Sequence, residues 1–210
     1  VAIDPEGRIW VPFTTPVLAV YAPDLELLTW FDLAPFGITN TEGAAVSPNG
    51  DVYVTNRAND KPGLFKFRWV ADDLEPVKEF GLNGWVPINE LRIPVFTPDG
   101  DVMLTSWTAG QVHLVDAETG MTTLFAEVPR SFMLDVDGAG RVYIVHYEQK
   151  NPALTILDPG GSILGTWSAA ELGFETELSG VAVTRDGTKL FILDQTAKAG
   201  GSVRAFDVKH

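Results

Sequence analysis

The chain repeats one pattern of apolar and polar positions five times. Each copy has a short apolar run, a tight turn ending in glycine, and a second run in which apolar and polar residues alternate, as in residues 51–55. Alternation with a period of two predicts a half-buried β-strand, and Pro or Asp shortly before Gly predicts a hairpin turn. The copies read VAIDPEGRIWV, AAVSPNGDVYV, PVFTPDGDVML, MLDVDGAGRVY and VAVTRDGTKLF, with turn glycines Gly7, Gly50, Gly100, Gly140 and Gly187.

Two more strand-like segments follow the hairpin in most copies. Third strands are predicted at residues 17–21, 63–67, 111–115, 153–157 and 202–206, and fourth strands at residues 25–31, 74–80, 121–126 and 162–167. Four antiparallel strands that recur every 40–50 residues or so are typical of a β-propeller blade.

The pattern therefore predicts an all-β fold, a single β-propeller domain over residues 1–210. Its five blades are expected at about residues 1–35, 36–83, 84–128, 129–170 and 171–210, and the last is expected to have three strands in this chain. The alternative within this fold is that the chain derives from a propeller with six blades. The competing fold is a β-sandwich. Helix is expected to be scarce, with residues 167–173 as the only plausible short helical turn.

Charge and composition exclude several classes of function. The chain has 28 Asp and Glu against 15 Lys and Arg, a net charge of −13, and no basic cluster, so it is not expected to bind nucleic acid. It has no cysteine, which excludes disulfides, thiol catalysis and cysteine-based zinc sites. Its apolar runs all fall well short of the ~18 residues that a membrane span requires, so no membrane insertion is expected.

In a propeller, the entries to the first strands and the ends of the second strands lie at the mouth of the channel, where ligand sites are built. Arg57, Arg92, Trp107 and Tyr147 occupy such positions and are predicted to bind a ligand, because arginine and aromatic residues dominate recognition surfaces. The alternative for Trp107 is that it packs beneath a loop. The other mouth positions are Phe13, Thr14, Glu42, Asn56, Ser106, Phe132, His146, Ser179, Asp194 and Gln195.

The sequence VYVTN at residues 52–56, with SPNG, TPDG, VDGAG and TRDG before the second strands, resembles the YVTN and NHL families of propeller repeats. It is also similar to the blades of gluconolactonase and strictosidine-synthase-like propellers. The resemblance covers essentially the whole chain at the level of blade architecture, so it implies the fold. These families include sugar lactonases, streptogramin lyases, cell-surface scaffolds and protein-binding platforms, so it does not single out one function.

The lactonase resemblance implies a divalent metal held by a Glu-Gly, an Asn-Gly and an Asp at blade entries. Glu42-Gly43 matches the first element, whereas Ser179-Gly180 stands where Asn-Gly is expected. Glu42, Asn56 and Asp194 are the metal candidates, with calcium as the cation, since hard cations require several oxygen ligands. Glu42 has two alternatives, a solvated carboxylate at a loop end or an ion pair with Arg92.

Streptogramin-lyase-like chemistry implies two histidines and a glutamate. The chain has His113, His146 and His210, and His146 beside Tyr147 and Glu148 is the best candidate for acid–base catalysis. A purely structural role is the alternative for His146.

Two long segments between strands are further candidates for binding. Residues 81–91 carry Trp85, and residues 167–179 carry Glu171, Glu175 and Glu177, which suit either a cation, a basic partner or plain solvation.

Taken together, the sequence favours a non-catalytic binding or scaffold propeller of an exported protein, located outside the cell, in the periplasm or at the cell surface. It would present its mouth residues to a protein or a small-molecule ligand, as part of a larger chain or assembly. The alternative is a divalent-metal-dependent lactonase or hydrolase with Glu42, Asn56, His146 and Asp194 around the channel.

Overall fold

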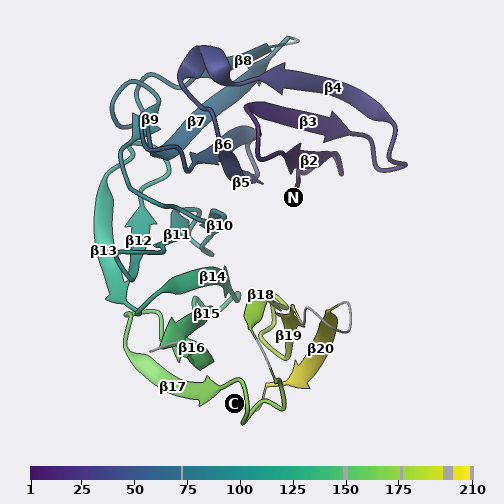
Figure 1. Ribbon diagram of the computed structural model, residues 1–210. Coiled ribbons are helices and arrows are strands. Elements are labelled where there is room, and N and C mark those ends of the chain that lie inside the picture. Colours follow the sequence, from purple (N-terminus) through teal and green to yellow (C-terminus); the bar gives the residue numbers. More distant parts are fainter. Residues whose placement is uncertain (72, 149–150, 176, 196–200, 209–210) are drawn as a thin grey trace. The chain divides into compact units, whose positions relative to one another are not determined.

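The computed structural model describes residues 1–71, 73–148, 151–175, 177–195 and 201–208. Its strands form five antiparallel sheets, β1 to β20 in chain order, which are the blades of a β-propeller, and the last blade has three strands (Figure 1). The predicted fold class is thereby confirmed. Among the described residues, helix is limited to a three-residue 3₁₀ turn, Ala34–Phe36. Residues 167 and 168 end strand β17, and residues 169–173 form hydrogen-bonded turns, with Leu172 N donating to Ser168 O at 3.2 Å.

The chain divides into two compact units, each described by itself. The first unit comprises residues 1–94 and 115–122, and the second comprises residues 95–114 and 123–210. None of the described helices is long and apolar enough to cross a membrane.

The first unit holds two blades. The first blade has the order β1 (Ala2–Ile3), β2 (Ile9–Pro12), β3 (Val17–Tyr21) and β4 (Leu27–Asp32). The second has the order β5 (Thr41–Val46), β6 (Asp51–Asn56), β7 (Gly63–Val70) and β8 (Asp73–Pro76), and β9 (Trp85–Val86) also pairs with β7. The second sheet therefore extends beyond residue 83, where the sequence pattern ended the second blade.

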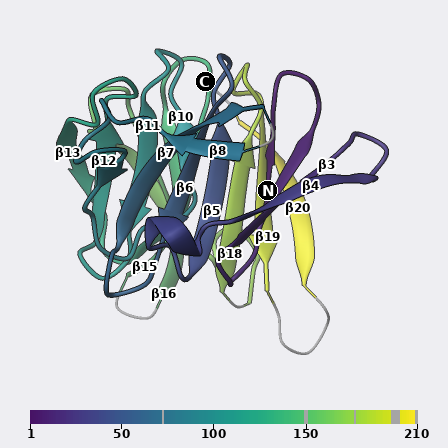
Figure 2. The same cartoon turned by 90° about the horizontal axis from the view of Figure 1, so that it is seen from above.

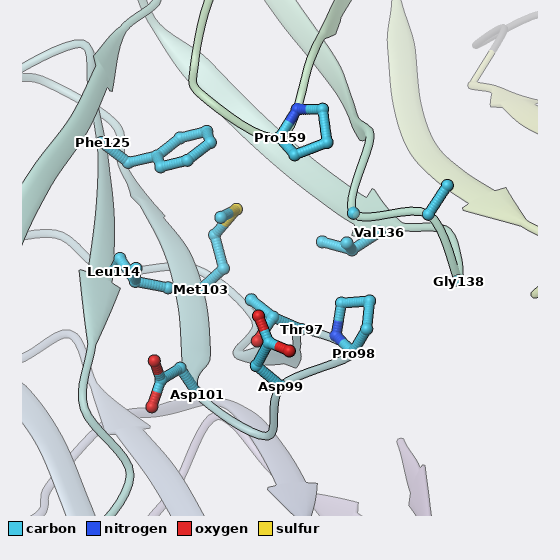
Figure 3. Close-up of a pocket in the computed structure, with 12 residues that line it drawn as sticks. Thr97, Pro98, Asp99, Asp101, Met103, Leu114, Phe125, Val136, Gly138 and Pro159 are labelled. Carbon is cyan, nitrogen blue, oxygen red and sulfur yellow. The ribbon is translucent and has the colours of Figure 1, made fainter.

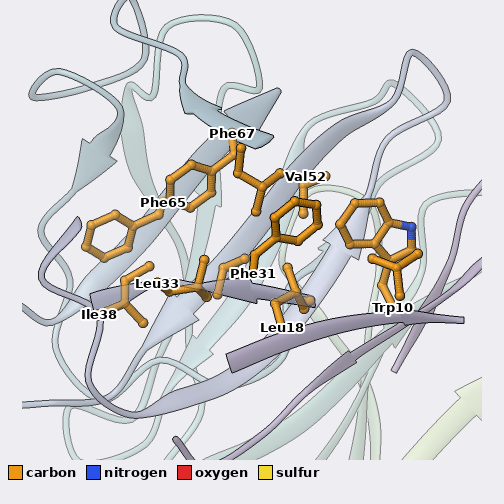
Figure 4. Packing of buried hydrophobic residues seen from close by; sticks show 12 residues of the cluster. Trp10, Leu18, Phe31, Leu33, Ile38, Val52, Phe65 and Phe67 are labelled. Carbon is orange, nitrogen blue, oxygen red and sulfur yellow. The ribbon is translucent and has the colours of Figure 1, made fainter. Parts of the chain in front are cut away.

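The core of the first unit lies between these two blades (Figure 4). Trp10 of β2, Phe31 of β4 and Phe67 of β7 are buried, and the Trp10 and Phe31 rings stack with centroids 6.2 Å apart. Alternation along each strand directs these side chains to one face of the sheet. Because each large apolar side chain contributes roughly 1.5–3 kcal/mol when it is removed from water, this cluster explains why neighbouring blades pack together.

The second unit holds the other three sheets. The third sheet has the order β10 (Val95–Phe96), β11 (Val102–Ser106), β12 (Gln111–Val115) and β13 (Thr122–Glu127). The fourth has β14 (Ser131–Val136), β15 (Val142–Glu148), β16 (Asn151–Leu157) and β17 (Ile163–Ser168). In the fifth, β18 (Leu178–Val183), β19 (Lys189–Asp194) and β20 (Ser202–Asp207) run side by side (Figure 2).

A buried aspartate stabilises the hairpin turn of the fourth blade. Asp137 follows β14, and its Oδ1 accepts hydrogen bonds from the backbone N–H groups of Ala139 (2.9 Å) and Arg141 (3.0 Å). Its Oδ2 accepts from Arg141 Nε at 2.7 Å and from the Tyr143 hydroxyl at 3.2 Å. Burial acts to raise the pKa of Asp137, but the hydrogen bonds from Arg141 and Ala139 outweigh it and hold that pKa below its ordinary value.

The first blade repeats this arrangement. Asp4 accepts from the backbone of Glu6 and Arg8, from Arg8 Nε at 2.6 Å and from Trp10 Nε1 at 2.9 Å. In both blades the aspartate therefore links the turn to the aromatic residue of the second strand.

Candidate functional site

A pocket lies at one edge of the second unit, where second strands end and first strands begin. The loop after β11, the end of β15 and the entries to β14 and β18 meet here. Thr105 Oγ1 donates to Phe132 O at 2.9 Å, and Gln195 N donates to Glu177 O at 3.2 Å. The pocket, called the mouth pocket below, has a volume of about 450 Å³ and is lined by Trp107, Arg130, Phe132, Tyr147, Glu177, Ser179 and Gln195.

Three aromatic rings form one wall of the mouth pocket. The Trp107 ring lies with its centroid 5.4 Å from that of Phe132 and 5.4 Å from that of Tyr147, and the Phe132 and Tyr147 centroids are 6.5 Å apart. All three pairs meet edge to face, the geometry that the ring quadrupoles favour. Each ring is half-buried, so the cluster is packed and still presents aromatic surface to the pocket.

Charged groups of both signs complete the pocket. Burial raises the pKa of Tyr147 to about 12, and the neighbouring Glu177 carboxylate acts in the same direction through its charge and hydrogen bonding. Tyr147 therefore stays protonated near neutral pH and is unsuited to act as a base there. Arg130 has a left-handed backbone with φ of 47°, and its carbonyl accepts from Tyr147 N at 3.3 Å.

The structure places two of the four predicted binding residues, Trp107 and Tyr147, in this pocket, together with three other predicted mouth positions. Sequence reasoning missed Arg130, which precedes the aligned entry position of β14, and it noted Glu177 only as one acid of the segment 167–179. Of the other acids there, Glu171 accepts from Ser168 N at 2.8 Å and thereby closes a local turn. That Trp107 and Tyr147 bind a ligand stays a prediction.

The candidate catalytic histidine does not line the mouth pocket. His146 lies in β15 with 3 % of its surface exposed, and its Nε2 is 2.8 Å from Thr155 Oγ1 on β16. Thr155 Oγ1 is in turn 2.8 Å from Thr166 Oγ1 on β17. His146 thus belongs to a polar chain across three strands, which favours the structural alternative. His113 lies in β12, where burial lowers its pKa, and His210 lies outside the described residues.

Thr155→Val should lower the free energy of unfolding by about 1–3 kcal/mol, because it leaves a buried imidazole nitrogen without its hydroxyl partner. Valine keeps the β-branched shape, so strand preference is retained. Thr166→Val is the matched control, since Thr166 is exposed and water can replace its bond, and it should cost less than about 0.5 kcal/mol. Urea unfolding measures both. Equal losses in the two variants would show that the hydrogen bond between His146 and Thr155 does not contribute to the stability of the protein.

In the first unit, Glu42 is held by two arginines. Arg92 Nη1 lies 2.6 Å from Glu42 Oε1, and Arg57 Nη1 lies 3.6 Å from Glu42 Oε2. Arg92 is buried, with 5 % of its surface exposed. The ion pair with Arg92 that the sequence suggested as one alternative for Glu42 is thus present. That Arg57 and Arg92 bind a ligand stays a prediction.

The three predicted metal ligands are each paired, hydrogen-bonded or buried in the structure, and calcium binding by them stays a prediction. Guanidinium groups already neutralise Glu42, and Asp194 is buried at the end of β19. Among the described residues there is no group of three or more His, Asp or Glu side chains that would hold a metal. Asn56 is fully used by backbone groups, since its Oδ1 accepts from the N–H groups of Thr39, Asn40 and Ala58 and its Nδ2 donates to the carbonyls of Gly37 and Lys61.

A second pocket, of about 280 Å³, lies at the turn end of the third and fourth blades (Figure 3). Met103, Leu114 and Phe125 form an apolar wall, and the carboxylates of Asp99 and Asp101 lie at its other side. Its lining residues include two carboxylates and no cationic side chain, and Phe125 is its one aromatic ring. The mouth pocket is therefore the better candidate for a ligand site.

No protein-family model and no curated protein matches the chain. Solved structures do match it. A gluconolactonase from Xanthomonas campestris has 14 % identity and a TM-score of 0.65, over 90 % of this chain and 66 % of that one. The virginiamycin B lyase of Staphylococcus aureus has 13 % identity and a TM-score of 0.63, over 99 % of this chain and 69 % of that one.

A chain of the nidogen/laminin complex has 11 % identity and a TM-score of 0.66, over 95 % of this chain and 73 % of that one. This chain is a β-propeller. At such low identity the likeness shows the fold alone. The chain spans 66 % of the length of the gluconolactonase, just under two thirds. The YVTN and NHL resemblance stays one of sequence pattern.

Proposed function

We propose that this protein is a non-catalytic binding propeller and that its mouth pocket receives a small ligand. The observation that carries the proposal is the edge-to-face cluster of Trp107, Phe132 and Tyr147 in a pocket that also has Arg130 and Glu177. Its volume, about 450 Å³, falls within the roughly 300–1,000 Å³ of typical small-molecule sites. Aromatic walls with a few polar groups are also the usual lining of such sites.

Binding is favoured over catalysis by the chemistry of the lining. The seven lining residues include no histidine, and Tyr147 has a pKa of about 12, far from neutral pH. Ser179 is the one aliphatic hydroxyl of the pocket, and its hydroxyl donates to the carbonyl of Leu193 at 3.5 Å. A nucleophile needs a base in hydrogen-bond reach.

The proposal includes an exported or cell-surface location within a larger chain or assembly. It is supported by the acidic, cysteine-free sequence. Fold neighbours include two proteins named as enzymes, a gluconolactonase and a lyase, and a protein–protein complex, so the fold is compatible with a binding role and with catalysis.

Saturation-transfer NMR with a library of soluble fragments tests the proposal. Wild-type protein should saturate a subset of fragments, and Ser179→Phe should abolish those signals because it adds a ring to the pocket wall. Ser162→Phe, in the exposed β16–β17 turn, is the matched control and should keep them. Both variants are first checked for a wild-type melting temperature. Fragments that bind both variants equally, or no binding fragments at all, would contradict the proposal.

A further inference from the structure

The mouth pocket has two side chains of opposite charge that do not form an ion pair with each other. Arg130 and Glu177 both line it, and in the part of the chain that the structure describes neither belongs to an ion pair. Both residues are exposed. A ligand with charges of both signs can therefore meet a separate partner for each.

The aromatic wall and Glu177 together suit an organic ammonium group. The face of an aromatic ring attracts a cation within about 6 Å, and several rings around one alkylated ammonium are a known way to recognise it. The Glu177 carboxylate lines the same pocket as these rings. A carboxylate beside the rings adds Coulomb attraction for the same cation.

Arg130 supplies the complementary contact. Its guanidinium forms paired hydrogen bonds with a carboxylate, a geometry that lysine cannot match. The chain as a whole carries a net charge of −13, so a plain anion is repelled at long range whereas a cation is attracted. An anionic group is thus best brought to Arg130 by a ligand that also carries a positive charge.

Resting on the proposed function, we propose that the mouth pocket binds a small organic zwitterion, an alkylated ammonium carboxylate. Its ammonium group lies against the rings of Trp107, Phe132 and Tyr147 with Glu177 beside it, and its carboxylate pairs with Arg130. Three half-buried rings, a carboxylate and a separate guanidinium in one pocket carry this assignment.

Titration calorimetry with three probes tests the ligand class. Glycine betaine carries both charges, 3,3-dimethylbutanoate is its carbon isostere without the positive charge, and tetramethylammonium carries the positive charge alone. Betaine should bind at least about tenfold more tightly than 3,3-dimethylbutanoate. The two probes differ only in the positive charge, which is attracted by the aromatic rings and by the Glu177 carboxylate. Tetramethylammonium should bind, more weakly than betaine.

Two variants separate the charges. Glu177→Gln should weaken betaine and tetramethylammonium by a similar factor, about fivefold to tenfold, whereas Arg130→Gln should weaken betaine about tenfold and tetramethylammonium less than twofold. The matched controls are Glu175→Gln and Arg185→Gln, two exposed residues that do not line the pocket, and both should bind betaine as the wild type does.

The outcomes distinguish this inference from the proposed function. If betaine binds no better than 3,3-dimethylbutanoate, or not at all, while fragments still bind in a manner lost in Ser179→Phe, the zwitterion class is wrong and the binding pocket stands. If neither the ammonium probes nor any fragment binds, both are overturned. If Arg130→Gln weakens betaine and tetramethylammonium equally, the assignment of Arg130 to the carboxylate is wrong.

Discussion

Asp137→Ala is expected to lower the free energy of unfolding by about 3–4 kcal/mol, the larger of the two effects argued here. Asp137 is fully buried and accepts four hydrogen bonds, two from backbone N–H groups, one from Arg141 and one from Tyr143. Alanine removes the carboxylate and leaves these donors without their acceptor. Removing one partner of a buried ion pair typically costs about 3–5 kcal/mol, and the 21 % exposure of the Arg141 side chain places this loss at the lower end of that range.

Chemical unfolding followed by tryptophan fluorescence measures this loss. Asp158→Ala is the matched control, because Asp158 closes a turn of the same blade through the backbone N–H groups of Gly160 and Ser162 but has no buried side-chain partner. The control should lose about 1 kcal/mol or less. Similar losses in the two variants would mean that the Asp137 network contributes no more than an ordinary turn.

The same network gives a pH dependence with a definite sign. The pKa of Asp137 is lowered in the folded protein, so the unfolded chain binds more protons in acid. Its contribution to stability is fully present above the ordinary value, 3.8, and is lost as the pH falls through the lower pKa of the folded state. Asp137→Asn should therefore show a shallower fall in stability below about pH 4 than the wild type. An identical acid profile would contradict the lowered pKa.

Glu42→Gln is expected to lower the free energy of unfolding by about 2 kcal/mol, the cost of a charge-assisted hydrogen bond to a buried group. Glu42 Oε1 lies 2.6 Å from Arg92, which is buried, and Arg57 is 3.6 Å away on its other oxygen. A neutral amide loses the charge attraction to both. Calcium should leave the melting temperature of the wild type unchanged, because the carboxylate is already neutralised.

Differential scanning fluorimetry with and without calcium measures both parts of this prediction. Glu26→Gln, at an exposed position of the first blade, is the matched control and should be nearly neutral. A calcium-dependent rise in melting temperature that disappears in Glu42→Gln would contradict this prediction and favour the hypothesis of a metal-dependent lactonase.

Local signals explain why the strands could be predicted from sequence. The predicted third strands at residues 17–21 and 111–115 coincide with β3 (Val17–Tyr21) and β12 (Gln111–Val115). The period-two alternation and the turn glycine each depend only on residues that are close together in the sequence, so both can be recognised without knowledge of the fold. Gly50 and Gly100, for example, have φ of 87° and 94°, which glycine adopts readily.

Features that depend on distant residues were not predicted. Trp85 was expected in a binding loop, but it forms β9 against β7, and its Nε1 donates to Pro62 O at 3.1 Å. The alignment placed His146 and Tyr147 together at the mouth, yet neighbouring residues of a strand point to opposite faces, so Tyr147 lines the pocket and His146 turns to Thr155. Arg130 and Glu177 reach the pocket from loops outside the repeat.

Two-dimensional ¹H–¹⁵N NMR with glycine betaine, and with the fragments retained by the saturation-transfer screen, tests the central claim most directly. If the mouth pocket is the ligand site, the largest shifts will fall on the Trp107 indole N–H, assigned with Trp107→Phe, and on the amides of Phe132, Tyr147 and Glu177. The indole signals of Trp10 and Trp85, in the first unit, will stay in place. Shifts concentrated at Asp99, Met103 and Gly138 of the second pocket, or none near Trp107, would contradict the account.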